Sequence, residues 1–369
     1  MFKRIAITAL LVTLAAALAA VSASALPARN GAVVFSMVSI EKTATEKGEG
    51  GSGAAEATRE RGGLYAAKEG RLNQLTENPG DSQPDFSSDG RTIVFSRAGD
   101  IYSVRADGSG ERMLTSGPEV DERPIFSPNG RIVVFERRSS SGAPRDLYTV
   151  RSSGGSPHAL TTTPADEHEA TFSDDGCMIA FVRSVGEPSG GTADDIYSIR
   201  PAGIRLRRLT RTPGTDEFAP RYFGEENVVF SRGQSGEGAD AYADVYTMRE
   251  NGSHVKPLVR GAGSAFVEDV APNGHAVLFR RDRGLWVKPI GPGRAHKISE
   301  LPDGSKTNAV FSSDGRRVAA FIADEEEESL SAIDVAHRRA TNLIEGFDPT
   351  EGGTGTSIGP VITWQPVRR

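Results

Sequence analysis

Four short acidic segments recur in the middle of the chain, and their carboxylates are the groups best suited to chemistry or binding. Each segment comes directly before a predicted strand, and together they contain Asp81, Asp121, Glu122, Asp166, Glu167, Asp216 and Glu217. Arg123, His168 and Phe218 lie beside them. Gathered in one place, such carboxylates would attract a basic protein segment, a cationic ligand or a divalent ion. The alternative is that they only cap turns or keep loops solvated.

Other reactive residue types give weaker signals. The six histidines are scattered and none is paired at metal-ligand spacing, so we predict no metal site and no cofactor. Cys177 is the only cysteine, which excludes an intramolecular disulfide and favours a surface thiol. Four further carboxylates precede the tyrosine of a predicted strand, and we expect them to accept local hydrogen bonds. These are Asp100, Asp146, Asp195 and Asp244.

The strands that must position the acidic segments belong to a repeat of roughly 40 to 50 residues, a period typical of propellers and solenoids. One unit has four predicted strands, at 84–86, 92–95, 100–104 and 113–115, with Asp89-Gly90 as a tight-turn signal between the first two. The central runs are apolar without alternation, which indicates that both faces of each small sheet are buried.

The two ends of the chain share one unit. Residues 31–35, 63–65 and 74–76 supply its last three strands, and 360–366 supplies the missing first strand. We therefore predict an all-β, closed β-propeller of four-stranded blades, with the C-terminal strand paired in the N-terminal blade. Seven blades are counted, with six as the alternative number and an open solenoid as the alternative architecture.

The N-terminal segment predicts export. Lys3 and Arg4 precede an apolar run at 5–21 and a small-residue cleavage pattern at 23–25, so residues 1–25 are predicted to be a removed signal peptide. A membrane anchor is the alternative. Residues 26–369 then form a single propeller domain without an integral membrane segment, with 42–62 as a disordered loop insertion in the first blade. The periplasm or cell envelope, or the extracellular space, is the expected location.

The charge balance argues against one class of partner. The net charge is −6 with both signs mixed along the chain, which does not provide the basic surface that nucleic acid requires. We expect a monomer whose partner is a protein or peptide.

The recurring strings Phe-Ser-Ser-Asp-Gly (86–90), Phe-Ser-Pro-Asn-Gly (126–130), Asp-Ile-Tyr and Leu-Thr resemble the WD40-like (PD40) repeats of the TolB propeller family. The resemblance covers residues 31–367. It implies an envelope propeller that engages other proteins across one mouth of its channel. TolB also has an amino-terminal α/β domain and a six-bladed ring, so its partners are not carried over to this chain.

These observations predict a binding scaffold, because the first strand of each blade is innermost and the acidic segments would surround one mouth. The alternative is a hydrolase or lyase acting on a small molecule or glycan in the channel. The blades also resemble the propeller that gates prolyl oligopeptidase-like peptidases, whose separate hydrolase domain carries a Gly-x-Ser-x-Gly string. That string occurs once here, at 355–359, but it lies directly before the predicted closing strand at 360–366, and the repeats use up the chain. We therefore predict that the chain is not an enzyme. A structural part of a larger secreted assembly is a third reading.

Overall fold

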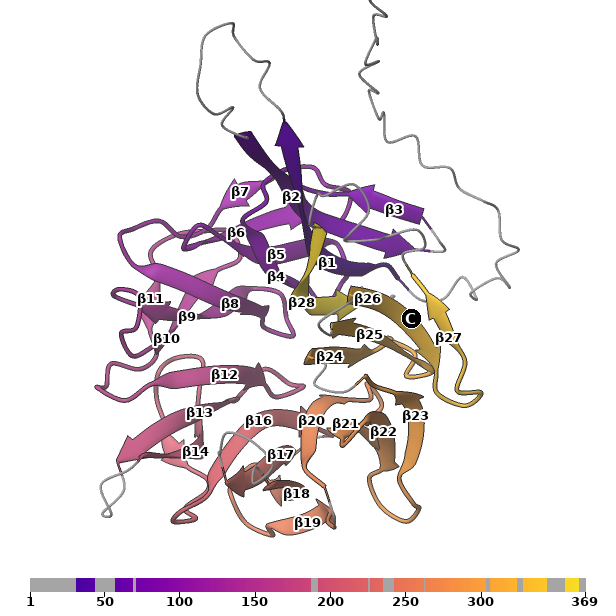
Figure 1. Ribbon diagram of the computed structural model, residues 1–369. Helices are drawn as coiled ribbons and strands as arrows, with labels where there is room; N and C mark the ends of the chain where they lie inside the picture. The colour runs from indigo at the N-terminus through magenta and orange to yellow at the C-terminus, as the bar shows by residue number, and fades with distance from the viewer. Residues whose placement is uncertain are drawn as a thin grey trace, which may run out of the picture.

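The chain folds into a ring of seven four-stranded antiparallel sheets, which are its blades (Figure 1). The computed structural model describes residues 31–43, 57–68, 71–186, 192–224, 226–234, 242–261, 263–302, 306–323, 328–343 and 356–364. All regular elements in these ranges are strands. The prediction of a closed all-β propeller with seven blades is confirmed, and the alternatives of six blades and of an open solenoid are wrong.

Blade 1 joins the two ends of the chain. It contains β28 (Thr356–Trp364), β1 (Val33–Thr43), β2 (Ala57–Lys68) and β3 (Arg71–Gln74), in that order outward. Ile362 of β28 lies opposite Phe35 of β1. The indole of Trp364 donates a 3.1 Å hydrogen bond to the Gly31 carbonyl. The predicted closure by the C-terminal strand is thus confirmed, and Figure 1 shows β28 beside β1.

Blades 2 to 4 each use four consecutive strands. Blade 2 has β4 (Asp81–Phe86), β5 (Thr92–Arg97), β6 (Asp100–Arg105) and β7 (Arg112–Met113). Blade 3 has β8 (Val120–Phe126), β9 (Ile132–Arg138), β10 (Asp146–Arg151) and β11 (His158–Ala159). Blade 4 has β12 (Glu167–Phe172), β13 (Ile179–Gly186), β14 (Thr192–Ile199) and β15 (Arg207–Arg208).

Blades 5 to 7 follow the same order. Blade 5 has β16 (Asp216–Phe223), β17 (Asn227–Gln234), β18 (Tyr242–Arg249) and β19 (Lys256–Val259). Blade 6 has β20 (Ala265–Val270), β21 (Ala276–Arg281), β22 (Gly284–Pro289) and β23 (His296–Glu300). Blade 7 has β24 (Lys306–Phe311), β25 (Arg317–Ala323), β26 (Glu328–Asp334) and β27 (Ala340–Asn342).

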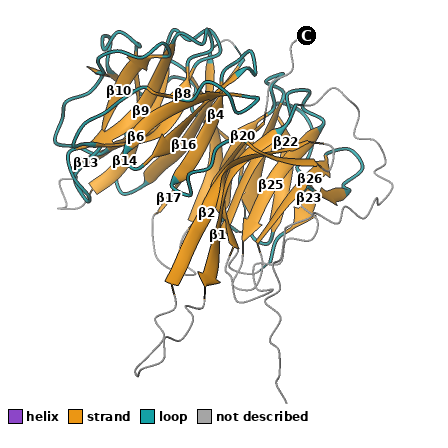
Figure 2. Cartoon of the chain, turned by 90° about the horizontal axis from the view of Figure 1, so that it is seen from above, coloured by secondary structure: helices purple, strands orange, loops and turns teal. Residues whose placement is uncertain are grey.

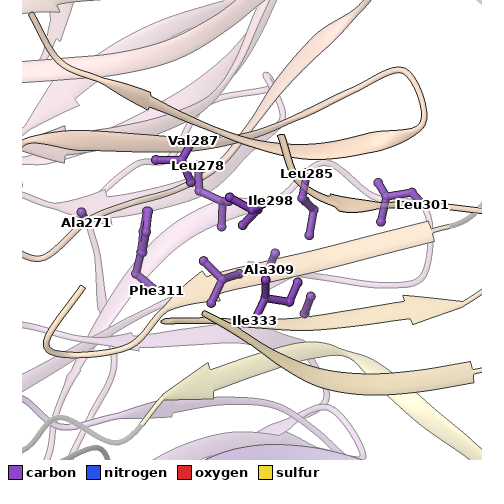
Figure 3. Close-up of a cluster of buried hydrophobic side chains, with 11 residues drawn as sticks. Ala271, Leu278, Leu285, Val287, Ile298, Leu301, Ala309, Phe311 and Ile333 are labelled. Atoms are coloured by element: carbon purple, nitrogen blue, oxygen red, sulfur yellow. The ribbon is translucent and has the colours of Figure 1, made fainter. Parts of the chain in front are cut away.

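The core lies between the blades, because the apolar second strands are buried on both faces. Each pair of neighbouring blades shares one apolar cluster, and seven clusters close the ring. Figure 3 shows the cluster between blades 6 and 7, where Leu278 and Ile298 of blade 6 face Phe311 and Ile333 of blade 7. Since no blade buries both its faces alone, the ring is the unit of stability.

The turn between the first and second strands is built by one repeated motif. In blade 2 the Ser87 hydroxyl donates to the Asp89 carboxylate at 2.7 Å, and Asp89 accepts the Arg91 amide at 3.1 Å. Gly90 then has a φ of 66°, a left-handed conformation that glycine adopts without strain. The predicted Asp-Gly turn is confirmed there and recurs in blades 4 and 7.

Two segments of the predicted domain organisation lie wholly or partly outside the described residues. The predicted signal peptide, 1–25, is one of them. Of the expected loop at 42–62, Lys42 and Thr43 lie in β1 and 57–62 in β2, so only 44–56 falls outside the described residues. The β1–β2 hairpin extends beyond the neighbouring blades in Figure 2.

Candidate functional site

The acidic segments lie where the innermost strands begin, at one face of the ring that we call the mouth face. Asp81 and Asp216 are the first residues of β4 and β16, Asp121 is the second residue of β8, and Glu167 is the first of β12. The second strand of each blade ends at this face, so its last residues pair with the acids. This places all four acidic segments on one face.

Four of the seven carboxylates are bound inside their own blades by an arginine of the second strand. The Asp121 carboxylate receives Arg137 Nε at 2.6 Å and Nη2 at 2.8 Å. The four pairs are Asp81–Arg97, Asp121–Arg137, Glu167–Arg183 and Glu217–Arg232. All four acids are nearly inaccessible to solvent, at 0–1% exposure. These carboxylates therefore neutralise buried arginines.

Each of these arginines also lies over two aromatic rings of its blade. Arg137 has its guanidinium carbon 5.4 Å from the centre of the Phe135 ring and 4.7 Å from that of Tyr148. The equivalent arginines of blades 2, 4 and 5 make the same two contacts. Cation–π attraction strengthens when the partners are shielded from water. We call this set the acid–arginine–aromatic unit.

Burial perturbs the two glutamates of this set. Removal from water raises the pKa of Glu167 to about 7, although the neighbouring Thr163 hydroxyl and Arg183 oppose the shift. Burial likewise raises the pKa of Glu217 to about 7, against the attraction of Arg232. A carboxylate needs solvent or a strong partner to stay ionised, and here burial outweighs the partner.

The other three predicted residues are more accessible or bind backbone. Glu122 and Asp166 have side chains 30% exposed, and each binds an arginine at 2.5 Å, namely Arg138 and Arg145. Burial acts to raise the pKa of Asp166, but the hydrogen bonds from Arg145 outweigh it and hold that pKa below its ordinary value. Asp216 accepts the Asp194 amide at 3.0 Å. Partner binding by the seven carboxylates stays a prediction.

Backbone bulges follow the acidic residues and link each blade to the next. Arg123, Glu169 and Ala219 have φ values of 51–55°, which are rare for residues with a side chain. Their amides donate across to the preceding blade: Arg123 to Gln83 Oε1 at 2.7 Å, and Ala219 to Glu169 Oε2 at 2.6 Å. The bulged strands are held in place by side chains of a neighbouring blade.

A buried carboxylate joins blades 3 and 4 at the mouth face. Glu136 is 3% exposed and accepts the Glu169 amide at 2.8 Å and the Arg145 guanidinium at 3.1 Å. Burial raises its pKa, while Arg123 and Arg145 act to lower it. Arg145 also binds Asp166, so the network runs across the boundary between the two blades.

An aromatic pair between blades 5 and 6 was missed as a pair by the sequence reasoning. Phe218 of blade 5 and Phe266 of blade 6 have ring centres 5.7 Å apart, and the Arg280 guanidinium lies 4.9 Å from the Phe266 ring. Arg280 Nε is also 3.5 Å from the Glu268 carboxylate. Phe218 and Phe266 are both half-buried and occupy the third and second positions of their innermost strands. We call Phe218, Phe266 and Arg280 the aromatic patch.

The described ranges hold no cluster of three or more His, Cys, Asp or Glu residues arranged to bind a metal ion. Within the same ranges no helix is long and apolar enough to cross a bilayer.

Comparison with known proteins defines the fold class but not a family. The chain is a seven-bladed β-propeller. No family model matches it, and neither does any curated protein. Among solved structures it is similar to TolB from Acinetobacter baumannii, with a TM-score of 0.53, 14% identity, and coverage of 89% of this chain and 82% of that one.

Two enzymes are similar at comparable identity and with higher TM-scores. An oligogalacturonate lyase from Vibrio parahaemolyticus has a TM-score of 0.61 and 12% identity, covering 84% of this chain and 100% of that one. A puromycin-hydrolysing peptidase from Mycobacterium tuberculosis has a TM-score of 0.60 and 14% identity, covering 78% of this chain and 50% of that one. At such identities the likeness shows the shared fold alone.

Proposed function

We propose that this chain is an exported, TolB-like binding scaffold whose protein partner docks on the mouth face, in the cell envelope or outside the cell. The observation that carries the proposal is the aromatic patch. Aromatic and arginine side chains are enriched at the centres of protein interfaces, where they supply most of the binding energy. Phe218, Phe266 and Arg280 bring both kinds of side chain together at the start of two adjacent innermost strands.

The acidic segments supply the polar part of the same surface in this proposal. Glu122 and Asp166 keep side chains 30% exposed, next to Arg138 and Arg145. Paired charges at a rim steer a partner and select among partners more than they add affinity. The four buried acids have a structural role in this proposal, because their pairing with arginines stabilises the mouth face. They are Asp81, Asp121, Glu167 and Glu217.

The test is capture of a partner by the mature chain from Leu26, attached to a support through Cys177. That thiol is exposed in the β12–β13 turn, at the opposite end of the strands from Glu167, so the mouth face stays free. The Phe218→Ala, Phe266→Ala double variant should lose the partner. A matched control removes Ile204 and Leu206, which are 55% and 46% exposed in the β14–β15 connection.

A partner that is retained by the control and lost by the Phe218, Phe266 variant, and that binds the purified wild type directly, supports the proposal. Equal retention by both folded variants would contradict it.

A second candidate function is a small-molecule or glycan enzyme near the ring axis. Burial raises the pKa of Glu268 to about 7 and that of Asp269 to about 6, values suited to proton transfer near neutral pH. Turnover of an acidic oligosaccharide that is abolished by Glu268→Gln, in a variant that is fully folded at the assay pH, would favour this candidate over the scaffold.

A further inference from the structure

Blade 6 contains an arginine whose carboxylate partner has been replaced by alanine. Arg281 lies opposite Ala265 in the β20–β21 pairing. In blades 2 and 3 the same register places Asp81 opposite Arg97 and Asp121 opposite Arg137. Ala265 therefore occupies the position of the acid in the acid–arginine–aromatic unit, and like those acids it is fully buried.

The atoms of Arg281 that lack partners are the atoms that bind the carboxylate elsewhere. In blades 2 and 3 the carboxylate oxygens receive Nε and Nη2 of the arginine, at 2.5–2.8 Å. In blade 6, Arg281 Nε and Nη2 are both buried and have no hydrogen-bond partner in the ranges the structure describes. The same two atoms of Arg183 also lack a hydrogen bond, but Glu167 lies 2.8 Å from Arg183 Nε, whereas Arg281 has Ala265 in the place of the acid. Such an arrangement is costly unless another group supplies the acceptor.

The surroundings of Arg281 favour an anion. Arg281 keeps one of the two aromatic contacts of the unit, with its guanidinium carbon 5.7 Å from the Phe279 ring centre. The Trp286 Nε1 donor is also buried without a partner in the described ranges. It lies beside Gly284, which is opposite Arg281 in the sheet, since a Cβ at Gly284 would be 3.0 Å from this nitrogen. The Lys297 ammonium lies 5.6 Å from the Trp286 ring centre and is itself paired with Glu300 at 2.9 Å.

One acidic side chain of the preceding blade bears on this site. Asp244 of blade 5 occupies the position that Asp195 has in blade 4, since both begin the Asp-apolar-Tyr segment of their third strands. The presence of Asp244 does not exclude a carboxylate from binding Arg281, as blade 5 shows. Asp195 lies close enough to Glu217 to act on its pKa, and Glu217 still pairs with Arg232 at 2.8 Å.

We propose that Arg281 binds a carboxylate supplied from outside the chain, through the two-point contact that Asp121 makes with Arg137. A planar guanidinium matches a carboxylate in both shape and charge. Arg281 is half-buried as a residue, whereas its Nε and Nη2 are covered, so a ligand from the mouth face reaches these atoms only when neighbouring side chains move aside. The carboxylate belongs either to a small free acid or to an acidic side chain of a polypeptide. The inference is independent of the proposed function, because it needs no contact with the aromatic patch.

The direct test follows the Nε–Hε resonance of Arg281 in protein labelled with ¹⁵N-arginine. The resonance is assigned from the spectrum of Arg281→Met. The probes are sodium acetate and a blocked Ala-Glu-Ala tripeptide, with sodium chloride at matched ionic strength and a blocked Ala-Gln-Ala tripeptide as controls. We expect a saturable shift of Arg281 with at least one acidic probe, no shift of Arg97, and loss of the response in Ala265→Asp.

The outcomes separate the two sources. A response to acetate identifies a free carboxylate as sufficient, whereas a response to the glutamate peptide alone identifies an acidic polypeptide segment. No saturable response to either acidic probe, or an equal response to the glutamine peptide, overturns the proposal.

An independent test supplies the carboxylate within the chain. Ala265→Asp should have a higher urea midpoint than the neutral, isosteric Ala265→Asn, because the aspartate can meet Arg281 as Asp121 meets Arg137. In the Arg281→Met background the order should reverse, because the aspartate is then buried without its partner. If the urea midpoint of Ala265→Asp is no higher than that of Ala265→Asn when Arg281 is present, the proposal is overturned.

Discussion

Asp121 binds Arg137 through both carboxylate oxygens, although 16 residues separate the two in the sequence. The pair lies at the mouth end of blade 3, with the arginine stacked on Phe135 and Tyr148. Three other blades contain an equivalent pair. The acids that the sequence offers as binding groups are therefore also structural groups, and substitutions must distinguish the two roles.

Removal of one member of this pair should destabilise the ring. Asp121→Ala leaves Arg137, whose side chain is 14% exposed, without its counter-ion, and we expect a cost of about 3 kcal/mol in the free energy of unfolding. The double variant Asp121→Ala, Arg137→Met should recover much of the loss. Urea denaturation measures both, with the exposed Glu77→Ala as the control. A single variant as stable as the Glu77 control would show that the pair contributes nothing.

Stability should increase as the pH falls from 8 to 6. The pKa of Glu268 is raised to about 7 by burial, so the folded chain takes up a proton in a range where the unfolded chain does not. The contribution of Glu268 to the free energy of unfolding is fully present below the ordinary glutamate pKa and is lost as the pH rises through 7. It amounts to at most about 3 kcal/mol.

The matching measurement is the urea midpoint of wild type and Glu268→Gln at several pH values. The variant should show a weaker dependence between pH 6 and 8, while Glu300→Gln, with a side chain 76% exposed, should behave as wild type. An unchanged slope in Glu268→Gln would mean that this carboxyl titrates normally.

The closure of the ring should contribute strongly to its stability. Ile362 of β28 is 3% exposed in the cluster that joins blades 7 and 1, and Ile362→Ala should cost about 2–4 kcal/mol. The neighbouring Thr363→Ala should cost less than about 0.5 kcal/mol. Denaturation and limited proteolysis report both. Equal effects of the two substitutions would show that β28 packs loosely on the ring.

The blades could be predicted from sequence because their signals are local and repeated. Apolar runs such as 92–95 and the turn at Asp89-Gly90 recur in register. The incomplete units at the two ends predicted that the C-terminal strand pairs in the N-terminal blade, where Ile362 lies opposite Phe35. The partners of the acids are not local. Arg97 follows its acid by 16 residues, and only the strand register brings the two together.

A sequence signal for these ion pairs existed nonetheless. The string Phe-x-Arg occurs at the end of the second strand in blades 2 to 6, for example at 95–97 and 279–281. An acid occurs at the start of the first strand in only four of these blades. The same comparison therefore shows that Arg281, in blade 6, lacks the acid found in the others. The contact between Phe218 and Phe266 has no such repeat, because it depends on two strands of adjacent blades.

Docking on the mouth face can be tested most directly by photo-crosslinking from two single positions of the mature chain. A benzophenone side chain replaces Phe218 in one protein and Ile204, on the opposite face, in the other. Both proteins are irradiated with envelope and culture fractions. The account predicts that a specific crosslinked protein forms only from position 218 and is competed away by unlabelled wild type. Specific products from position 204 alone, or the same products from both positions, would contradict it.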